Sequence, residues 1–248
     1  MTTVFSSSKD IAIVAALERE VKPAVKGWRV SHREHNGRRF KFFENDRAVL
    51  VCSGIGAEAG RRAAEALIAL YKPKIMASAG FAGALEPSLR VGDLFVPRCV
   101  VDAGDSSRAE TKIGKGILVS SRSIAGEDQK RSLAKAYSAQ AVDMEAAAVA
   151  RSAGIHGIDF LAVKAISDEL GFPLPPMKGF VTADGQFQER KFALFCAVRP
   201  WLWLSVLRLA RNTGRAAKSL CRWLNQYNEP EFLKNKPAGL HPMNKAPS

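Results

Sequence analysis

The stretch from Val142 to Asp168 most constrains the fold, because an alanine-rich run is followed directly by a short apolar run. Residues 142–150 have strong helix propensity and little side-chain bulk. Residues 160–166 are mostly apolar and lead into Ser167 and Asp168, as expected of a buried parallel strand that opens into a polar loop. This pattern predicts Glu145 inside a helix and Asp168 at the strand end, where open α/β sheets bind ligands. Alone, either residue has a plainer interpretation, a solvated helix position for Glu145 and an N-cap for Asp168. Together they favour a site.

The rest of the chain alternates strand-like and helix-like stretches. Short apolar runs predict strands at 11–17, 38–45, 48–53, 74–79 and 116–121. Helices are predicted at 57–71 and, as an exposed charged helix, at 127–138. Residues 80–84 read as a small-residue turn and residues 104–115 as a polar loop. Several strands are continuous apolar runs, so the sequence predicts an α/β fold with a largely parallel sheet.

Candidate site residues gather where the predicted strands end. Glu20 follows the first strand, although a solvated turn explains it equally well. The Gly54-x-Gly56 turn leads into a helix and could cradle an anion, but it lacks the third glycine of a dinucleotide fingerprint. Phe81 lies among small residues, where a core position competes with a role in stacking on a ligand.

Length and composition predict one main domain with a tail. The chain has 248 residues, and 47% of them are hydrophobic, which is ample for a substantial core. The four cysteines form no C-x-x-C pair, so we expect no metal site, no disulfide framework and a reducing compartment. We see no signal-peptide pattern and no apolar run long enough to span a membrane, and therefore expect a cytoplasmic protein.

The positive charge is concentrated in the tail. The formal net charge is +13, and residues 190–248 hold eleven Lys and Arg against two Glu. Five of these cations recur every three or four residues, which predicts the basic face of an amphipathic helix over about 200–224: Arg208, Arg211, Arg215, Lys218 and Arg222. Such a helix could lie on an anionic membrane surface, or pack on the core or a second subunit with its basic face solvated. Residues 234–248 are predicted to be disordered.

Five short motifs together resemble a known family. In order and spacing, they resemble the signatures of the 5′-methylthioadenosine/S-adenosylhomocysteine nucleosidases, within the nucleoside phosphorylase superfamily; the motifs are residues 16–21, 53–56, 90–93, 142–146 and 165–168. Residues 78–83 and 199–203 are most similar to the branch of hopanoid-associated phosphorylases, which act on adenosylhopane. No single motif is decisive, but five in the right order make a strong combined signal.

This resemblance implies a three-layer α/β/α fold with a mixed, largely parallel sheet, usually dimeric. It implies a catalytic domain over 1–197, followed by a basic extension over 198–233. The implied activity is cleavage of the bond between adenine and ribose, here in adenosylhopane during hopanoid lipid biosynthesis. A methylthioadenosine/S-adenosylhomocysteine nucleosidase is the first alternative. A non-catalytic module that binds nucleotides or nucleic acid is the second, although the tail shows no recognised nucleic-acid motif.

The resemblance also implies roles for individual residues. Asp168, held protonated by burial, would donate a proton to N7 of the leaving adenine, and Glu20 would activate water. Glu145 would accept hydrogen bonds from the ribose hydroxyls while Met144 packs on the sugar. The other implied substrate-binding positions are Ser167, Ile166, Phe81, Gly80, Ser53 and Lys164. Of these, Phe81 and Lys164 depart from the family pattern, which usually has a serine and an arginine there. The family's purine-stacking aromatic has no counterpart within 121–140.

The nucleophile stays open between water and phosphate. No cofactor is expected, but phosphorolysis would need inorganic phosphate as a co-substrate. A phosphorylase would need arginines and hydroxyls that converge on a dianion. Arg19, Ser53 and Ser78 are the nearest candidates and make an incomplete set. Glu20, by contrast, could serve as the base that a hydrolase requires.

Overall fold

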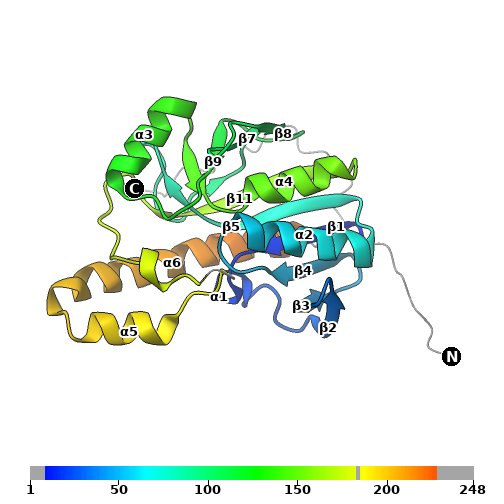
Figure 1. Cartoon of the computed structure of the whole chain (residues 1–248), viewed down its shortest axis with the longest axis horizontal. Helices are drawn as coiled ribbons and strands as arrows, with labels where there is room; N and C mark the ends of the chain where they lie inside the picture. The colour runs from blue at the N-terminus through cyan, green and yellow to red at the C-terminus, as the bar shows by residue number, and fades with distance from the viewer. Residues whose placement is uncertain (1–8, 183–184, 228–248) are drawn as a thin grey trace, which may run out of the picture.

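The predicted alternation of strands and helices produces a central sheet with helices on both of its faces (Figure 1). The computed structural model describes residues 9–182 and 185–227. Within these residues the sheet has 11 strands, mixed in direction. This confirms the predicted α/β class and its three layers.

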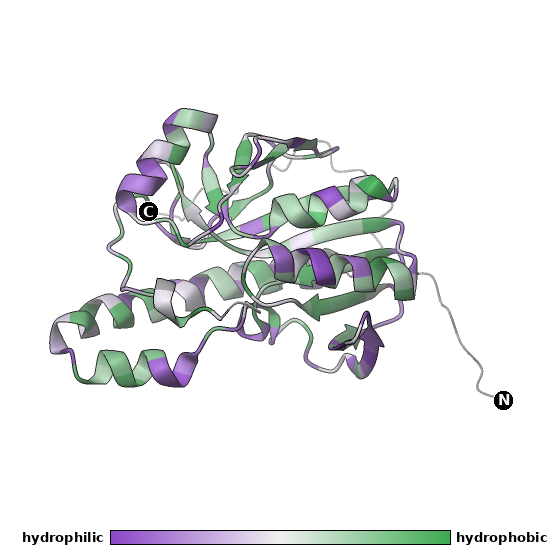
Figure 2. Ribbon diagram, in the orientation of Figure 1, coloured by the Kyte–Doolittle hydropathy of each residue, from purple (hydrophilic) through white to green (hydrophobic). Residues whose placement is uncertain are grey.

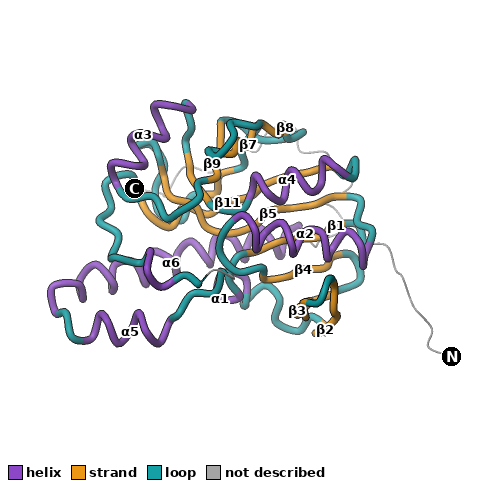
Figure 3. The backbone as a smooth tube through the Cα atoms, in the orientation of Figure 1, coloured by secondary structure: helices purple, strands orange, loops and turns teal. Residues whose placement is uncertain are grey.

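Most of the strands, drawn in orange in Figure 3, follow apolar runs of the sequence. They are β1 (Ile11–Ala15), β2 (Arg29–His35), β3 (Arg38–Glu44), β4 (Ala48–Cys52), β5 (Ile75–Ala84), β6 (Leu94–Phe95), β7 (Cys99–Asp102), β8 (Arg108–Glu110), β9 (Ile117–Ser120), β10 (Ala141–Asp143) and β11 (Asp159–Asp168). The helices are α1 (Glu18–Val21), α2 (Ala57–Tyr71), α3 (Glu127–Tyr137), α4 (Ala146–Ile155), the 3-10 turn η1 (Lys178–Phe180), α5 (Glu189–Ala197) and α6 (Pro200–Tyr227).

The sheet places β5 at its centre. Its main path runs β2-β3-β4-β1-β5-β10-β9-β7-β8, and β11 branches from β5 and also pairs with β6. Strand β5 is parallel to both β1 and β11, so these three strands end at the same edge. Carboxyl ends of parallel strands are where open sheets bind ligands, and this edge holds most of the site.

Residues of β1 show how the two faces are covered. Ile11, Ile13 and Ala15 face α6 and α1, in a cluster with Leu220 and Leu224. Ala12 and Val14 point to the opposite face, where they pack with the helices α2 and α4. Because successive strand residues point to opposite faces, a strand that is apolar throughout needs a helical layer on each side.

Residues 80–84 belong to β5, so the predicted turn was wrong. The strand runs on to Ala84 because it pairs with β11 along its length and with β10 at its end. Glycine weakens a strand in isolation, but pairing on both sides outweighs that preference. The small residues instead leave room for side chains of the site to approach the strand.

The position of Glu145 also differs from the prediction. Residues 141–143 form β10, and α4 starts only at Ala146, so Glu145 precedes the helix and does not lie inside it. The Asp143 carboxylate accepts a hydrogen bond from the Ala146 N–H at 2.9 Å. It therefore satisfies one of the free donors at the start of α4. Helix propensity could not reveal this, because the boundary depends on β10 pairing with β9.

The apolar pattern of the sequence did not predict two charged strands. Strand β2 is rich in Arg, His and Glu and pairs only with β3, at the sheet edge. Strand β8 lies within residues 104–115, which were predicted to be a loop. Their hydrogen bonds come from neighbouring strands, and such exposed edge strands lack the apolar alternation on which the prediction relied.

Helix α6 confirms the predicted C-terminal helix, but its two halves have different surroundings. Leu220, Cys221, Trp223 and Leu224 are buried against the sheet, so this half takes the alternative of packing on the core. At the other end Trp201 and Leu207 are 72% and 67% exposed. All five cations of the basic face are exposed. Residues 234–248, predicted to be disordered, lie outside the described residues.

Exposed apolar side chains continue from α6 onto the adjoining α5. The two helices form a hairpin that projects from one end of the molecule, with many hydrophobic residues at its tip (Figures 1 and 2). We call the exposed set the hairpin patch: Leu194, Val198, Trp201, Trp203, Leu204 and Leu207. Within the described residues, no helix is long and apolar enough to cross a membrane.

Candidate active site

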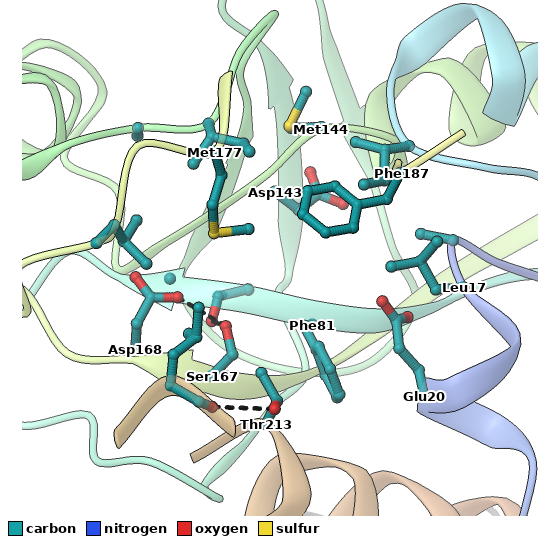
Figure 4. A pocket seen from close by; sticks show the side chains of 18 of the residues that line it. Leu17, Glu20, Phe81, Asp143, Met144, Ser167, Asp168, Met177, Phe187 and Thr213 are labelled. Carbon is teal, nitrogen blue, oxygen red and sulfur yellow. Dashed lines mark hydrogen bonds between the residues drawn. The ribbon is translucent and has the colours of Figure 1, made fainter. Parts of the chain in front are cut away.

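A pocket of about 610 Å³ opens where β1, β5 and β11 end. Figure 4 shows Asp168 and Glu20 on opposite sides of it, with Phe81 between them. Strand β11 supplies Asp168, helix α1 supplies Glu20 and strand β5 supplies Phe81. Three segments that are far apart in the sequence therefore converge on one cavity.

The pocket includes six of the ten predicted site residues. These six line it: Glu20, Phe81, Met144, Glu145, Ser167 and Asp168. Ser53 is buried, and its hydroxyl donates to the backbone carbonyls of Ala15 and Gly54. The backbone of Ile166 is engaged with Gly92 and Asp93, so it is not free to contact a purine base as expected.

Gly80 supports the pocket from behind. A Cβ atom at this position would lie 2.9 Å from the Glu20 Oε2 atom. Only glycine leaves the Glu20 carboxyl group this space, so Gly80 allows the close approach of that side chain.

Glu20 is the most exceptional carboxyl group in the pocket. It is buried, and its Oε2 atom has no hydrogen-bond partner within the part of the chain that the structure describes. Burial, and secondarily the nearby Glu145, raise the pKa of Glu20 to about 8. Buried polar atoms are almost always paired, so an unpaired carboxyl oxygen on a residue that lines a pocket marks Glu20 as a candidate functional group.

Glu145 is held by backbone groups. The Gly56 N–H donates to its Oε1 atom at 2.7 Å, and the Met144 N–H donates to its Oε2 atom at 3.3 Å. Burial, followed by the neighbouring Asp143, raises the pKa of Glu145 to about 7. The Gly54-x-Gly56 turn therefore holds a carboxylate of the protein. The Gly56 N–H is engaged by Glu145 and is not available to a phosphate.

Lys164 is buried behind the pocket and not on its surface. Its ammonium group is 2.8 Å from the Asp143 carboxylate and donates to the Ser78 hydroxyl at 2.9 Å. Burial alone would lower the pKa of Lys164, but the carboxylates of Asp143, Glu145 and Glu20 outweigh it and raise that pKa. Its charge is thus already committed to carboxylates of the protein.

A β-bulge positions Asp168. The pairing register between β11 and β5 shifts between Ile166 and Asp168, so that Asp168 lies opposite Gly83. Bulges near active sites often redirect a side chain in this way. The Ser167 hydroxyl donates to the Asp168 Oδ1 atom at 2.7 Å. A Cβ atom on Gly83 would lie 2.9 Å from the Asp168 Oδ2 atom, so glycine is required there for this arrangement.

Lys130 is the residue that sequence reasoning missed. It extends from α3, is 1% exposed, lines the pocket, and forms an ion pair with Asp168. A buried ammonium group therefore touches Asp168, which the apolar strand before it did not indicate. Lys130 is one of several charged residues in a helix predicted to be exposed. The only signal in the sequence was its spacing from Leu133, the other buried residue of α3.

The remaining wall of the pocket is mostly apolar, although Arg19, Ser123, Glu189 and Thr213 also line it. The connector after β11 and the helices α5 and α6 supply its apolar side chains: Leu174, Met177, Phe187, Phe192, Val206 and Leu209. In Figure 4, Met177 and Phe187 lie over the side of the pocket away from Phe81. The proline-rich connector therefore covers part of the pocket, and the C-terminal hairpin is a component of the site.

Known proteins share this fold and part of this sequence. The model of the Phosphorylase superfamily matches residues 10–116 and 102–197. A 5′-methylthioadenosine/S-adenosylhomocysteine nucleosidase of Staphylococcus aureus is 30% identical over 196 residues, covering 64% of this chain and 86% of the relative.

Solved structures show the same architecture at lower identity. A 5′-methylthioadenosine/S-adenosylhomocysteine nucleosidase of Helicobacter pylori is 17% identical, with a TM-score of 0.65 over 88% of this chain and 97% of the other. The futalosine hydrolase of the same organism is 18% identical, with a TM-score of 0.64 over 87% and 95% of the two chains.

Proposed function

Because this chain belongs to the phosphorylase superfamily and cleaves glycosyl bonds, we propose that it hydrolyses the N-glycosidic bond of an adenosyl compound with a large apolar 5′ substituent. The observation that carries the proposal is the unpartnered, buried oxygen of Glu20 on the opposite side of the pocket from Asp168. A nucleosidase needs a general base that activates water on one side of the scissile bond. On the other side it needs a proton donor for the leaving purine.

The proposed roles follow from this placement. The ionised form of Glu20, whose share grows as pH rises toward about 8, takes the proton of the attacking water, and Asp168 lies at the leaving adenine. Glu145, already aligned by two backbone N–H groups, accepts hydrogen bonds from the ribose hydroxyls. Positive charge that develops on the ribose is stabilised by nearby carboxylates, provided that they are placed in advance. Met144 and Phe81 supply the apolar contacts of the ribose.

Charge favours water over phosphate as the nucleophile. Glu20, Asp143 and Glu145 lie at the ribose side, with Lys164 as their common counter-ion. The cations that line the pocket within the described residues are Arg19 and Lys130, and each is paired with a carboxylate. A phosphate dianion would need donors that are not already committed to carboxylates of the protein.

The apolar wall supports a hydrophobic 5′ substituent. Side chains such as Leu174, Phe192 and Val206 offer few polar groups to a charged amino acid such as homocysteine. Adenosylhopane, which the family resemblance suggested, has the required chemistry, and a role in hopanoid lipid biosynthesis would follow. Methylthioadenosine, whose 5′ substituent is small and apolar, is the alternative substrate.

Free adenine measured by chromatography tests the proposal. The protein would be incubated with adenosylhopane, methylthioadenosine and S-adenosylhomocysteine, each with and without inorganic phosphate. We expect the highest kcat/KM for adenosylhopane and no dependence on phosphate. Strict phosphate dependence would replace hydrolysis by phosphorolysis. No adenine from any of the three would remove the function and restore the alternative of a binding module.

We further propose that the hairpin patch contacts an anionic membrane surface. Residues 190–227 contain eight Lys and Arg and no acidic residue, and the patch exposes Trp201 and Trp203, side chains suited to a membrane interface. Each cation near an anionic surface contributes about 1 kcal/mol before screening by salt. Two copies of so basic a surface would repel each other, so a homodimer, which the resemblance implies, would use another face.

Cosedimentation with vesicles tests the surface. The triple variant W201S/W203S/L207S should pellet with vesicles containing anionic lipid at least about tenfold less than the parent. I155S alters an equally exposed apolar residue on the far helix α4 and is the matched control. Equal pelleting of all three proteins, or none by the parent, would exclude the surface.

A further inference from the structure

The contact between Lys130 and Asp168 is buried and is supported by further hydrogen bonds. Besides the Asp168 carboxylate, the Lys130 ammonium donates to the Glu169 carbonyl at 2.8 Å and to the Asp168 carbonyl at 3.5 Å. Gly83 lies beside the pair, where a Cβ atom would be 3.0 Å from Lys130 Cε and 2.9 Å from Asp168 Oδ2. Both side chains line the pocket, and Lys130 is almost fully removed from solvent.

This contact changes how the leaving base can be protonated. The buried Lys130 ammonium group contacts the Asp168 carboxylate directly, so its hydrogens lie immediately behind the group that faces the leaving base. The nearest acidic hydrogens to its Oδ2 atom are those of the Lys130 ammonium. The hydroxyl of Ser167 is the other donor to Asp168, but a serine hydroxyl is too weak an acid for this task.

We propose that Lys130 is the source of the proton that reaches the leaving adenine, with Asp168 as the relay. This inference rests on the proposed function. As the C1′–N9 bond breaks, its electron pair stays on the purine, N7 takes a proton from Asp168, and Asp168 takes one from Lys130. Water forms the new bond to C1′ and gives its proton to Glu20. Lys130 ends as a neutral amine and Glu20 as a carboxylic acid, and exchange with solvent restores both.

The test uses a pair of substrates that differ only in whether the leaving group needs a proton. One is the adenosyl substrate itself. The other carries 4-nitrophenol in place of adenine, which leaves as a stable anion. In K130R a positive charge remains beside Asp168, but the guanidinium group holds its protons too tightly to donate them. For this variant we expect kcat for adenine release to fall at least about 100-fold, with release of 4-nitrophenolate within about threefold of the parent.

K130M provides a second, independent readout. Without the ammonium group Asp168 has lost its proton source, so K130M should also release adenine at least about 100-fold more slowly than the parent while keeping the release of 4-nitrophenolate within about threefold. Circular dichroism would confirm that both variants are folded. E20Q is the matched control, because it removes the base for water and should slow both substrates.

The outcomes separate this inference from the function on which it depends. If the parent and K130R release adenine equally well, Lys130 is not the proton source although the function stands. Equal loss of both substrates in K130R would mean a structural role and would also overturn the inference. A parent protein that cleaves neither substrate would refute both proposals together.

Discussion

Individual carboxyl groups differ in this pocket because their partners differ. Asp168 faces an ammonium group, Glu145 faces two backbone N–H groups, and one oxygen of Glu20 faces none. Burial raises the pKa of both glutamates, to about 8 for Glu20 and about 7 for Glu145. Equal residue types thus acquire different chemical roles from their surroundings.

Asp168→Asn should abolish turnover, because an amide cannot relay a proton. The loss should be on the order of 100- to 10,000-fold in kcat. The variant should also lose about 3–5 kcal/mol of stability, since it leaves the Lys130 charge buried without a partner. Urea denaturation measures this loss. The double variant K130M/D168N should recover most of it, and a double variant as unstable as the single one would contradict the ion pair.

Glu20→Gln should change how stability depends on pH. The pKa of Glu20 is raised from 4.5 to about 8, so between these values the folded protein retains a proton that the unfolded chain loses. Stability contributed by this group is therefore present below about pH 4.5 and is lost as pH rises to about 8. Glutamine carries no charge and avoids that loss.

The measurement is thermal unfolding at pH 5 and pH 9. From pH 5 to pH 9, the free energy of unfolding of E20Q should rise relative to that of the parent by a few kcal/mol, at most about 5. A difference between E20Q and the parent that does not change with pH would show that Glu20 titrates normally.

Among the elements, β5 and α6 decide the geometry of the site. Strand β5 is glycine-rich where it passes the side chains of Glu20 and Asp168, at Gly80 and Gly83. Helix α6 belongs to the core at one end and to the pocket wall in its middle, through Val206 and Leu209. Each element thus couples packing to the position of catalytic groups.

Gly83→Ala should impair catalysis more than stability. Its Cβ atom would press on the ends of two flexible side chains, Asp168 and Lys130, which can shift but then lose their alignment. We expect kcat to fall at least about tenfold, because small displacements at a reacting group are costly. Gly154→Ala, in α4 with no atom near its Cβ position, is the control and should retain normal activity. Equal activities of the two variants would contradict the close contact.

At the scale of the whole molecule, the second half of the C-terminal helix is part of the core. The division at residue 197 stays a prediction, but Leu220, Trp223 and Leu224 share one hydrophobic cluster with β1, β5 and β11. Replacing a buried leucine by alanine costs about 2–5 kcal/mol, and the total stability of a protein is about 5–15 kcal/mol.

A chain that ends at Ala197 should therefore not unfold cooperatively. Differential scanning calorimetry should show no transition for it, whereas W201S/W203S/L207S, which changes only exposed residues of α6, should melt within about 3 °C of the parent. A truncated chain with a normal transition would show that α6 is dispensable for folding. For the same reason, membrane binding is better tested with point variants than by truncation.

The sequence by itself determined the class of fold and most of the site. Continuous apolar runs that alternate with helical stretches require a sheet covered on both faces, and polar residues directly after those runs must gather at its edge. Glu20, Asp168 and the helix 57–71 could be identified because their signals are local in the sequence. The five ordered motifs added the family.

Only the tertiary structure decided what each charged residue touches. Lys130 appears as one more cation on a charged helix, and only the packing of α3 at the end of β11 brings it to Asp168. Glu145 leaves its predicted helix because β10 pairs with β9, and residues 80–84 become a strand because β5 is paired on both sides. Hydrogen bonds and ion pairs between distant segments outweigh local propensity, and a single sequence does not record them.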